Sequence, residues 1–217
     1  LMRLTLLYRK ERIMIAQIDE KGSLYHTLHD LPLRNISYLE ITTSFSSLPG
    51  SNKDLEVMRA DFRIDQALGT DKALPIEIPA SLSAEIIAEM KTLDNEFDLS
   101  KVPELLETLW KSNDSYVRVS PADRIARLLH LFSETETSGG ISLRRETTDH
   151  GEYRISFGVS NPPHAGFLSQ LLEVFQRLNI GVKRCYALTI STGISPCFLS
   201  NFYVIPREKQ PFDDDSP

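Results

Sequence analysis

The order of structural signals in the last third of the chain constrains the fold most. Residues 153–159 alternate apolar and polar side chains, as a strand with one buried face does. Asn161-Pro162-Pro163 then interrupts any regular element. Residues 167–178 place apolar side chains at helical spacing, and strand signals follow over 182–190 and 198–205. This strand–helix–strand–strand order predicts an α+β fold built on an antiparallel sheet.

The rest of the chain has strand signals towards both ends and helix signals in the middle. Strands are predicted over residues 4–8, 13–18, 36–45, 55–64 and 141–146, with a short helix over 23–34. A helix is predicted over 80–97, and two more begin at Ser100 and Ser120, each a capping hydroxyl near a proline. Gly139-Gly140 ends the helical stretch, and Asn179 can cap the helix of residues 167–178.

A faint internal repeat links the two ends of the chain. Arg34-Asn35-Ile36 precedes a long strand, a turn and a second strand, and so does Leu178-Asn179-Ile180. If the repeat is real, two similar sheets are joined by the helices of residues 80–135. The alternative is that any two units made of strands and a helix share this pattern.

Composition limits the function classes. The 217 residues carry 24 Lys+Arg and 30 Asp+Glu, a net charge of -6, so there is no basic excess with which to bind a nucleic-acid backbone. No apolar run is long enough to span a membrane, and two cysteines fit a reducing cytoplasm. The composition therefore excludes a nucleic-acid scaffold, a membrane protein and a disulfide miniprotein. The first residue, Leu1, suggests an excised piece of a longer protein, although a trimmed chain would look the same.

Familiar catalytic motifs are absent from the sequence. It has no G-x-G-x-x-G, P-loop, H-E-x-x-H, C-x-x-C or G-x-S-x-G. His26 and His29 are three residues apart, but nothing local supplies the third ligand that a metal needs, so no metal site is predicted. Cys185 and Cys197 lie on adjacent predicted strands and are interpreted as buried thiols.

The loop of residues 161–166 is the best candidate site. It joins the end of a strand to the start of a helix, where free N–H groups and the helix dipole favour a carboxylate or phosphate. Gly166 would let a ligand approach the backbone, and Phe167 and Leu168 would form an apolar wall. The alternative is that the two prolines and the glycine only shape a tight turn.

This part of the chain resembles an ACT domain, a small βαββαβ regulatory module of ferredoxin-like fold that binds amino acids. The resemblance rests on the strand 155–159, the Gly166 loop, the helix 167–178 and Asn179-Ile180-Gly181-Val182 entering a strand. It implies ACT-like antiparallel sheets with helices on one face, in two units joined by a helical segment. The last helix and strand of the module are not visible after Ile205. Either they lie beyond Pro217 or they come from elsewhere, for example from residues 141–146 and a preceding helix.

A narrower resemblance covers about a quarter of the chain. Residues 161–175, 177–180, 185–191 and 198–204 are similar to the N-terminal region of large bacterial NAD-dependent glutamate dehydrogenases. In that family the catalytic lysines and the dinucleotide-binding fold lie further towards the C-terminus. The resemblance therefore implies a cytoplasmic, non-catalytic region that carries no cofactor of its own, with NAD bound only by the catalytic part of the full-length oxidoreductase.

From the resemblance we expect four segments and one effector site. The segments are an ACT-like β-rich unit at 1–78, a helical connector at 79–136, an ACT domain at 137–206 and a linker or tail at 207–217. The expected effector-binding residues are Asn161, Pro163, His164, Ala165, Gly166, Phe167 and Leu168, with Arg184 and Tyr186 as weaker candidates for the far side.

Three functions follow from these expectations. The first is amino-acid sensing and assembly, in which an amino acid binds at the 161–167 loop and a second sheet, from residues 3–64 or another subunit, completes the site. Its partners would be the catalytic dehydrogenase domain of the same polypeptide and further copies in a homo-oligomer, and the effect would be allosteric. The second is purely structural oligomerisation without a small-molecule ligand. The third, a small stand-alone enzyme, is disfavoured by the missing motifs.

Overall fold

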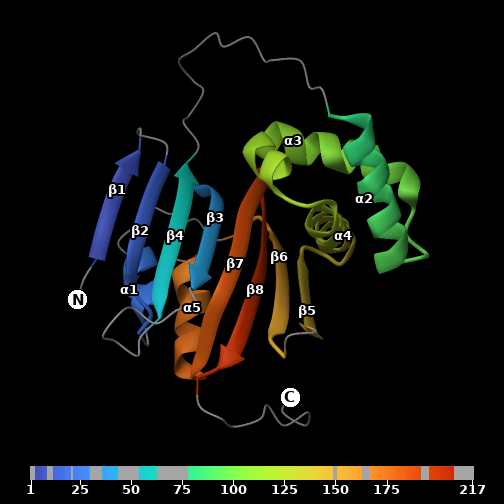
Figure 1. Cartoon of the computed structure of the whole chain (residues 1–217). Coiled ribbons are helices and arrows are strands. Elements are labelled where there is room, and N and C mark those ends of the chain that lie inside the picture. The colour runs from blue at the N-terminus through green and yellow to red at the C-terminus, as the bar shows by residue number, and fades with distance from the viewer. Residues whose placement is uncertain are drawn as a thin grey trace.

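One antiparallel sheet of eight strands organises the molecule. The computed structural model describes residues 3–8, 12–20, 22–29, 36–43, 54–62, 78–148, 151–162, 167–191 and 196–207. Within them the strands have the order β1-β2-β4-β3-β7-β8-β6-β5 (Figure 1). The predicted α+β fold with antiparallel pairing is confirmed. The two expected sheets are instead one continuous sheet, because β3 and β7 pair with each other.

The first four strands and a helix form what we call the first half. Its elements are β1 (Arg3–Tyr8), β2 (Arg12–Ile18), α1 (Ser23–His29), β3 (Ile36–Thr43) and β4 (Leu55–Phe62). Each lies where hydrophobic alternation or helical spacing predicted it. The turn expected between the strands of residues 36–45 and 55–64 lies outside the described residues.

The middle of the chain is helical, as predicted, but its caps differ from the expectation. Its elements are α2 (Ala80–Leu93), a 3₁₀ turn (Leu99–Lys101), α3 (Val102–Val119) and α4 (Ala122–Thr137). Ser100 does not cap a helix; its backbone N–H donates to Asp98, which caps the 3₁₀ turn. Pro121, not Ser120, stands at the start of α4 and makes no side-chain cap bond.

The remaining strands and helix form the second half. Its elements are β5 (Ile141–Thr147), β6 (Tyr153–Ser160), α5 (Phe167–Arg177), β7 (Ile180–Ser191) and β8 (Pro196–Pro206). Asn179 has a φ of 57°, the left-handed conformation expected of a residue that ends a helix. Gly139 and Gly140 also have positive φ, which explains why glycines end α4.

The two halves share one topology and most of one register, apart from the strand irregularities, which lie between Ile36 and Tyr38 in β3 and between Val182 and Arg184 in β7. Each has the chain order strand–strand–helix–strand–strand, and the sheet order β1-β2-β4-β3 in the first half matches β5-β6-β8-β7 in the second. Met58 pairs with Ile41 and Ile15, and Phe202, 144 positions later, pairs with Cys185 and Ile155. Residues of β3 and β4 therefore correspond to residues 144 positions later, and those of β1 and β2 to residues 140 positions later. The starts of α1 and α5, Ser23 and Phe167, are also 144 positions apart.

The halves meet around an approximate two-fold axis. Where β3 pairs with β7, Ile41 lies opposite Cys185, its own counterpart 144 positions later. The flanking pairs Glu40–Tyr186 and Thr42–Arg184 exchange places under the same offset. The arrangement is that of a symmetric dimer of two like sheets, formed within one chain.

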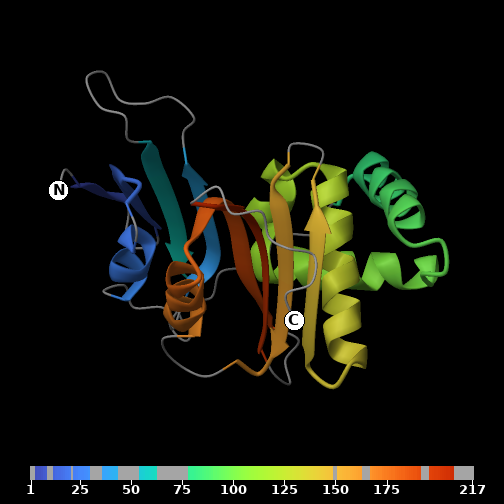
Figure 2. The ribbon, with the colours of Figure 1, turned by 90° about the horizontal axis from the view of Figure 1, so that it is seen from below.

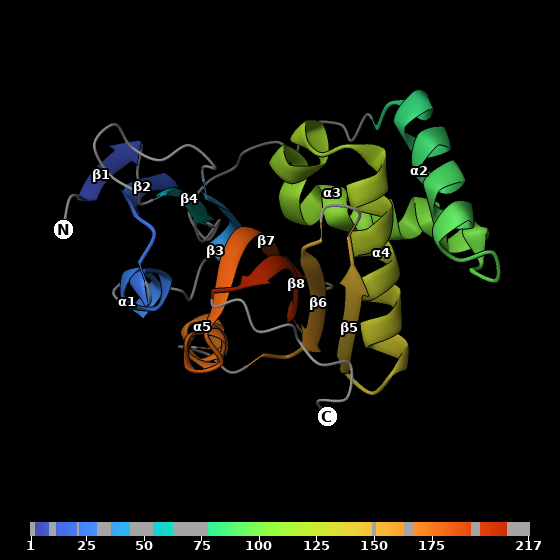
Figure 3. The same ribbon diagram turned by 60° about the horizontal axis from the view of Figure 1, so that its bottom comes forward.

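Helices cover both faces of the sheet, not one as expected. α1 and α5 lie side by side on one face, and α2, α3 and α4 lie on the other (Figure 3). The reason is that β7 is apolar on both faces: Cys185 and Ala187 belong to the core under α1 and α5, whereas Leu188 and Ile190 belong to the core under α2–α4. Figure 2 shows α4 running along β5 and β6 at one edge. No described helix covers the corresponding face of β1, β2 and β4 (Figure 1).

Candidate functional site

The structure describes only the two ends of the predicted effector loop. Pro163, His164, Ala165 and Gly166 lie outside the described residues. Asn161 directly follows β6 and has a φ of 52°, and its backbone N–H donates to the Pro196 carbonyl at 2.7 Å. The loop therefore starts next to the beginning of β8.

Phe167 and Leu168 anchor the start of α5 on the sheet. The Phe167 ring stacks on Phe157 at 5.6 Å between centroids and meets the Phe198 ring edge-on, also at 5.6 Å. Leu168 is buried in the core under α1 and α5. Both side chains thus contribute to this core beside the predicted loop.

Arg184 and Tyr186 point to the other face of the sheet. An Arg184 guanidinium N–H donates to Glu152 at 2.6 Å, and the guanidinium lies over the Tyr203 ring. Tyr186 packs in the core under α2–α4, with the Arg124 guanidinium 3.9 Å from its ring centroid. The structure therefore does not bring Arg184 and Tyr186 together with Phe167 and Leu168.

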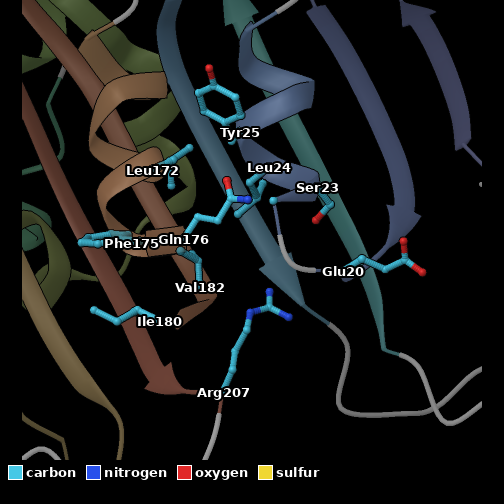
Figure 4. Close-up of a pocket in the computed structure, with 11 residues that line it drawn as sticks. Glu20, Ser23, Leu24, Tyr25, Leu172, Phe175, Gln176, Ile180, Val182 and Arg207 are labelled. Carbon is cyan, nitrogen blue, oxygen red and sulfur yellow. The ribbon is translucent and has the colours of Figure 1, made fainter. Parts of the chain in front are cut away.

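A pocket that sequence reasoning missed lies where the two halves meet on the α1 and α5 face (Figure 4). It is lined by Glu20, Gly22, Ser23, Leu24 and Tyr25 of the first half and by Leu172, Phe175, Gln176, Ile180, Val182 and Arg207 of the second. Its cavity of about 20 Å³ has room for about one water molecule. A larger ligand would have to displace a side chain.

The pocket is the first half's counterpart of the predicted loop. Gly22, Ser23 and Leu24 stand 144 positions before Gly166, Phe167 and Leu168. The connection from β2 to α1 belongs to the first half, and α5 and β7 of the second half complete the pocket. A detectable signal existed in the sequence: Gly22 precedes Asn35-Ile36 by the same spacing that separates Gly166 from Asn179-Ile180.

The backbone conformation at position 22 favours glycine, and a side chain there would have to displace the flexible Gln176 side chain. The φ of Gly22 is +87°, a conformation that strains other residues. A Cβ there would also lie 2.7 Å from the Gln176 amide nitrogen. The Gln176 amide therefore packs against the Gly22 backbone and fills the space between α1 and α5, as Figure 4 shows.

Charged side chains stand at one end of the pocket. The Arg207 guanidinium extends into it (Figure 4) and donates to Asp19 at 2.5 Å. The Arg207 backbone N–H donates to the Asn179 carbonyl, which holds this residue beside the start of β7. Glu20 adds a carboxylate at the rim. A guanidinium beside a carboxylate can receive a ligand that carries both charges.

A buried carboxylate stands behind the pocket wall. Glu56 on β4 is fully buried, and its Oε1 accepts a hydrogen bond from Gln17 at 2.5 Å and a long one from the Ser23 hydroxyl at 3.5 Å. Thr27 in turn donates to Gln17. Burial raises the pKa of Glu56 to about 7, and Asp19 adds to the rise, against lowering by Gln17, Arg207 and Ser23.

No group of three or more His, Cys, Asp or Glu residues among those described could hold a metal ion. Both cysteines are buried, as predicted, and burial raises both thiol pKa values. None of the described helices is long and apolar enough to cross a membrane. No protein-family model and no curated protein matches the sequence.

Proposed function

We propose that this chain is a non-catalytic regulatory region that binds an amino acid between its two halves. The observation that carries the proposal is the Gly22 pocket. It combines a strand-to-helix connection of one half with the helix and strand of the other, at the centre of a pseudo-symmetric pair. This is the kind of inter-unit site that the resemblance to ACT domains implied, with the roles of the two halves exchanged.

The topology of each half supports an ACT-like module with a rearranged chain order. β5 lies at the sheet edge next to β6, so residues 141–146 occupy the place considered for the module's missing last strand. The helix before it, α4, lies on the opposite face from α5. The proposed module therefore keeps the sheet and first helix of an ACT domain and places its other helix differently.

The pocket's chemistry suits an α-amino acid. The Arg207 guanidinium would bind the ligand's carboxylate, and the acidic side chains nearby would receive its ammonium group. Leu172, Phe175 and Val182 offer apolar contact to the ligand side chain. Entry requires the Gln176 amide to swing away from Gly22, since the cavity as it stands admits only about one water.

Regulation would follow from the position of the ligand between the halves. A ligand that binds one arrangement of the halves more tightly than another shifts the population towards it. We propose that the shift is passed to a catalytic NAD-dependent glutamate dehydrogenase region of the same polypeptide, in a homo-oligomer. NAD would bind to that catalytic region.

The test is a thermal-shift panel of the twenty L-amino acids, each added alone to the purified chain, to Gly22→Val and to Gly139→Val. Gly139 is a matched control: its φ of +83° imposes the same strain, but a Cβ there meets nothing within 4 Å. One or two amino acids should stabilise the wild type and Gly139→Val, by about 2.7 kcal/mol at 100 times the dissociation constant, and leave Gly22→Val unchanged. Gly166→Val probes the equivalent loop of the second half.

No shift with any amino acid would contradict the proposal and favour assembly alone. One observation supports that second candidate: β5 exposes Ile141 and Leu143, 63% and 67% accessible, and lies at the edge of the described sheet, where it pairs with β6 alone. Sedimentation would then show a ligand-independent oligomer that Leu143→Lys dissociates.

A further inference from the structure

Glu56 and Gln17 form a buried polar pair that the second half lacks. The residues that correspond to Gln17 and Glu56 are Phe157 and Ser200, 140 and 144 positions later. There the Phe157 ring packs on Phe167, and the Ser200 hydroxyl is satisfied by the Phe157 carbonyl. The second half thus shows that this fold needs no carboxylate at the position of Glu56. A buried carboxylate costs stability unless it is fully paired.

Glu56 is only partly paired in the described part of the chain. Its Oε1 takes both hydrogen bonds, from Gln17 and Ser23, and its Oε2 is buried with no hydrogen-bond partner among the described residues. Thr43, opposite it on β3, donates instead to the Val182 carbonyl. Such a buried, half-satisfied carboxylate is a group that a ligand can complete.

The pocket lies one side chain away from Glu56. Ser23 both lines the pocket and contacts Glu56, at a length of 3.5 Å that makes the bond weak. The charged groups around Glu56 and the pocket are Asp19 and Glu20 after β2 and Arg207 after β8. Arg207 already donates to Asp19, so Glu56, whose Oε2 is buried without a hydrogen-bond partner among the described residues, is the acidic group best placed for a new cation.

We propose that Glu56 is a ligand-binding residue that accepts the protonated amine of the molecule entering the Gly22 pocket, in place of the weak contact from Ser23. This inference rests on the proposed function and sharpens it: the site selects α-amino acids over simple carboxylic acids and nucleotides. Since Glu56 titrates near pH 7, pairing with an ammonium group favours its ionised form. The carboxyl proton then leaves to solvent, and the ligand keeps its own.

Proton release separates this role from a structural one. The experiment is isothermal titration calorimetry at pH 7 with the amino acid found in the thermal-shift panel, run in phosphate and in Tris, whose ionisation enthalpies differ. The wild type should release about half a proton per ligand bound. Glu56→Gln, which keeps the shape, should release none and bind at least about tenfold more weakly. Glu85→Gln, an exposed glutamate on α2, serves as the matched control.

A second probe tests the amine directly. The carboxylic acid with the same carbon skeleton but no amine should bind the wild type at least about tenfold more weakly than the amino acid, and should bind Glu56→Gln no worse than the wild type. If Glu56→Gln binds the amino acid as the wild type does, with the same proton release, the role of Glu56 is overturned while the proposed function stands. If no amino acid binds the wild type, both fall. Circular dichroism shows whether Glu56→Gln is folded.

Discussion

The two halves have the same strand order and largely the same register, yet they bury different kinds of side chain at equivalent positions. In the second half, the Ser200 hydroxyl donates a hydrogen bond to the Phe157 carbonyl. Helices cover both sheet faces there. In the first half, Gln17 and Glu56 occupy the same places, and no described helix covers the face opposite α1. Backbone pairing and a few apolar positions therefore maintain the topology. Other buried side chains differ between the halves, and Gln17 and Glu56, beside the pocket, are among those that differ.

The core under α1 and α5, to which both halves contribute, gives the largest expected effect on stability. Leu28 on α1 and Leu172 on α5 correspond at the 144-residue offset and are both buried in the core under α1 and α5. Leu28→Ala and Leu172→Ala should each cost about 3 kcal/mol of unfolding free energy, through lost burial and a cavity. Because the core contains residues of both halves, each variant should shift one common transition in urea denaturation.

Val174→Ala, on the exposed side of α5, is the control and should change stability by less than about 0.5 kcal/mol. Two resolved transitions, of which each variant moves only one, would mean that the halves unfold independently and share no cooperative core.

The covered and uncovered faces should respond differently to the same residue. Gly158 lies under α4, where a Cβ would meet the Thr135 hydroxyl at 2.0 Å and the Ser142 hydroxyl at 2.9 Å. Its counterpart 140 positions earlier is Ile18, half-buried on the face without a described helix. Gly158→Val should destabilise by about 2–3 kcal/mol through overpacking, and Ile18→Val by less than about 1 kcal/mol. A cost of Gly158→Val no larger than that of Ile18→Val in urea denaturation would contradict overpacking under α4.

The buried carboxylate of Glu56 should add a pH dependence to the stability of the protein that Ser200, at the equivalent position of the second half, does not add. The pKa of Glu56 is about 7 when folded, against an ordinary value of 4.5, so the folded state holds this proton more tightly. That stabilisation is complete at low pH and is lost as pH rises from about 4.5 to 7. Glu56→Gln should therefore gain about 2 kcal/mol relative to the wild type between pH 5 and pH 8.

The measurement is urea denaturation of both proteins at the two pH values. Ser200→Ala, at the equivalent position of the second half, carries no titrating group and should show no such pH-dependent difference from the wild type. A Glu56→Gln difference that does not change with pH would mean that Glu56 is ionised throughout this range.

Local signals were enough to predict the elements of this chain. Alternation and helical spacing located the strands and helices, and the likeness between Asn35-Ile36 and Asn179-Ile180 indicated the repeat. The side of the sheet on which the central helices lie could not be predicted, because it depends on both faces of β7 being apolar in a sheet whose pairing was unknown.

The pocket was missed for a related reason. Its two walls are separated by about 150 residues in the sequence and meet only because β3 pairs with β7. Gly22 is followed by polar Ser23, whereas the predicted effector loop of residues 161–166 is followed by apolar Phe167. Glu56 gave no signal at all, since a glutamate in a predicted strand is usually on the solvent side.

The pairing of β3 with β7 has a consequence for how such a molecule can evolve and respond. Two separate subunits dissociate on dilution. Two halves of one chain have an effective concentration relative to each other that does not depend on the protein concentration. In a dimer of identical subunits every substitution also appears twice, once on each side of the axis. Here a glutamate at position 56 appears once, so one site of the pair can differ in chemistry while the equivalent position of the other half carries Ser200.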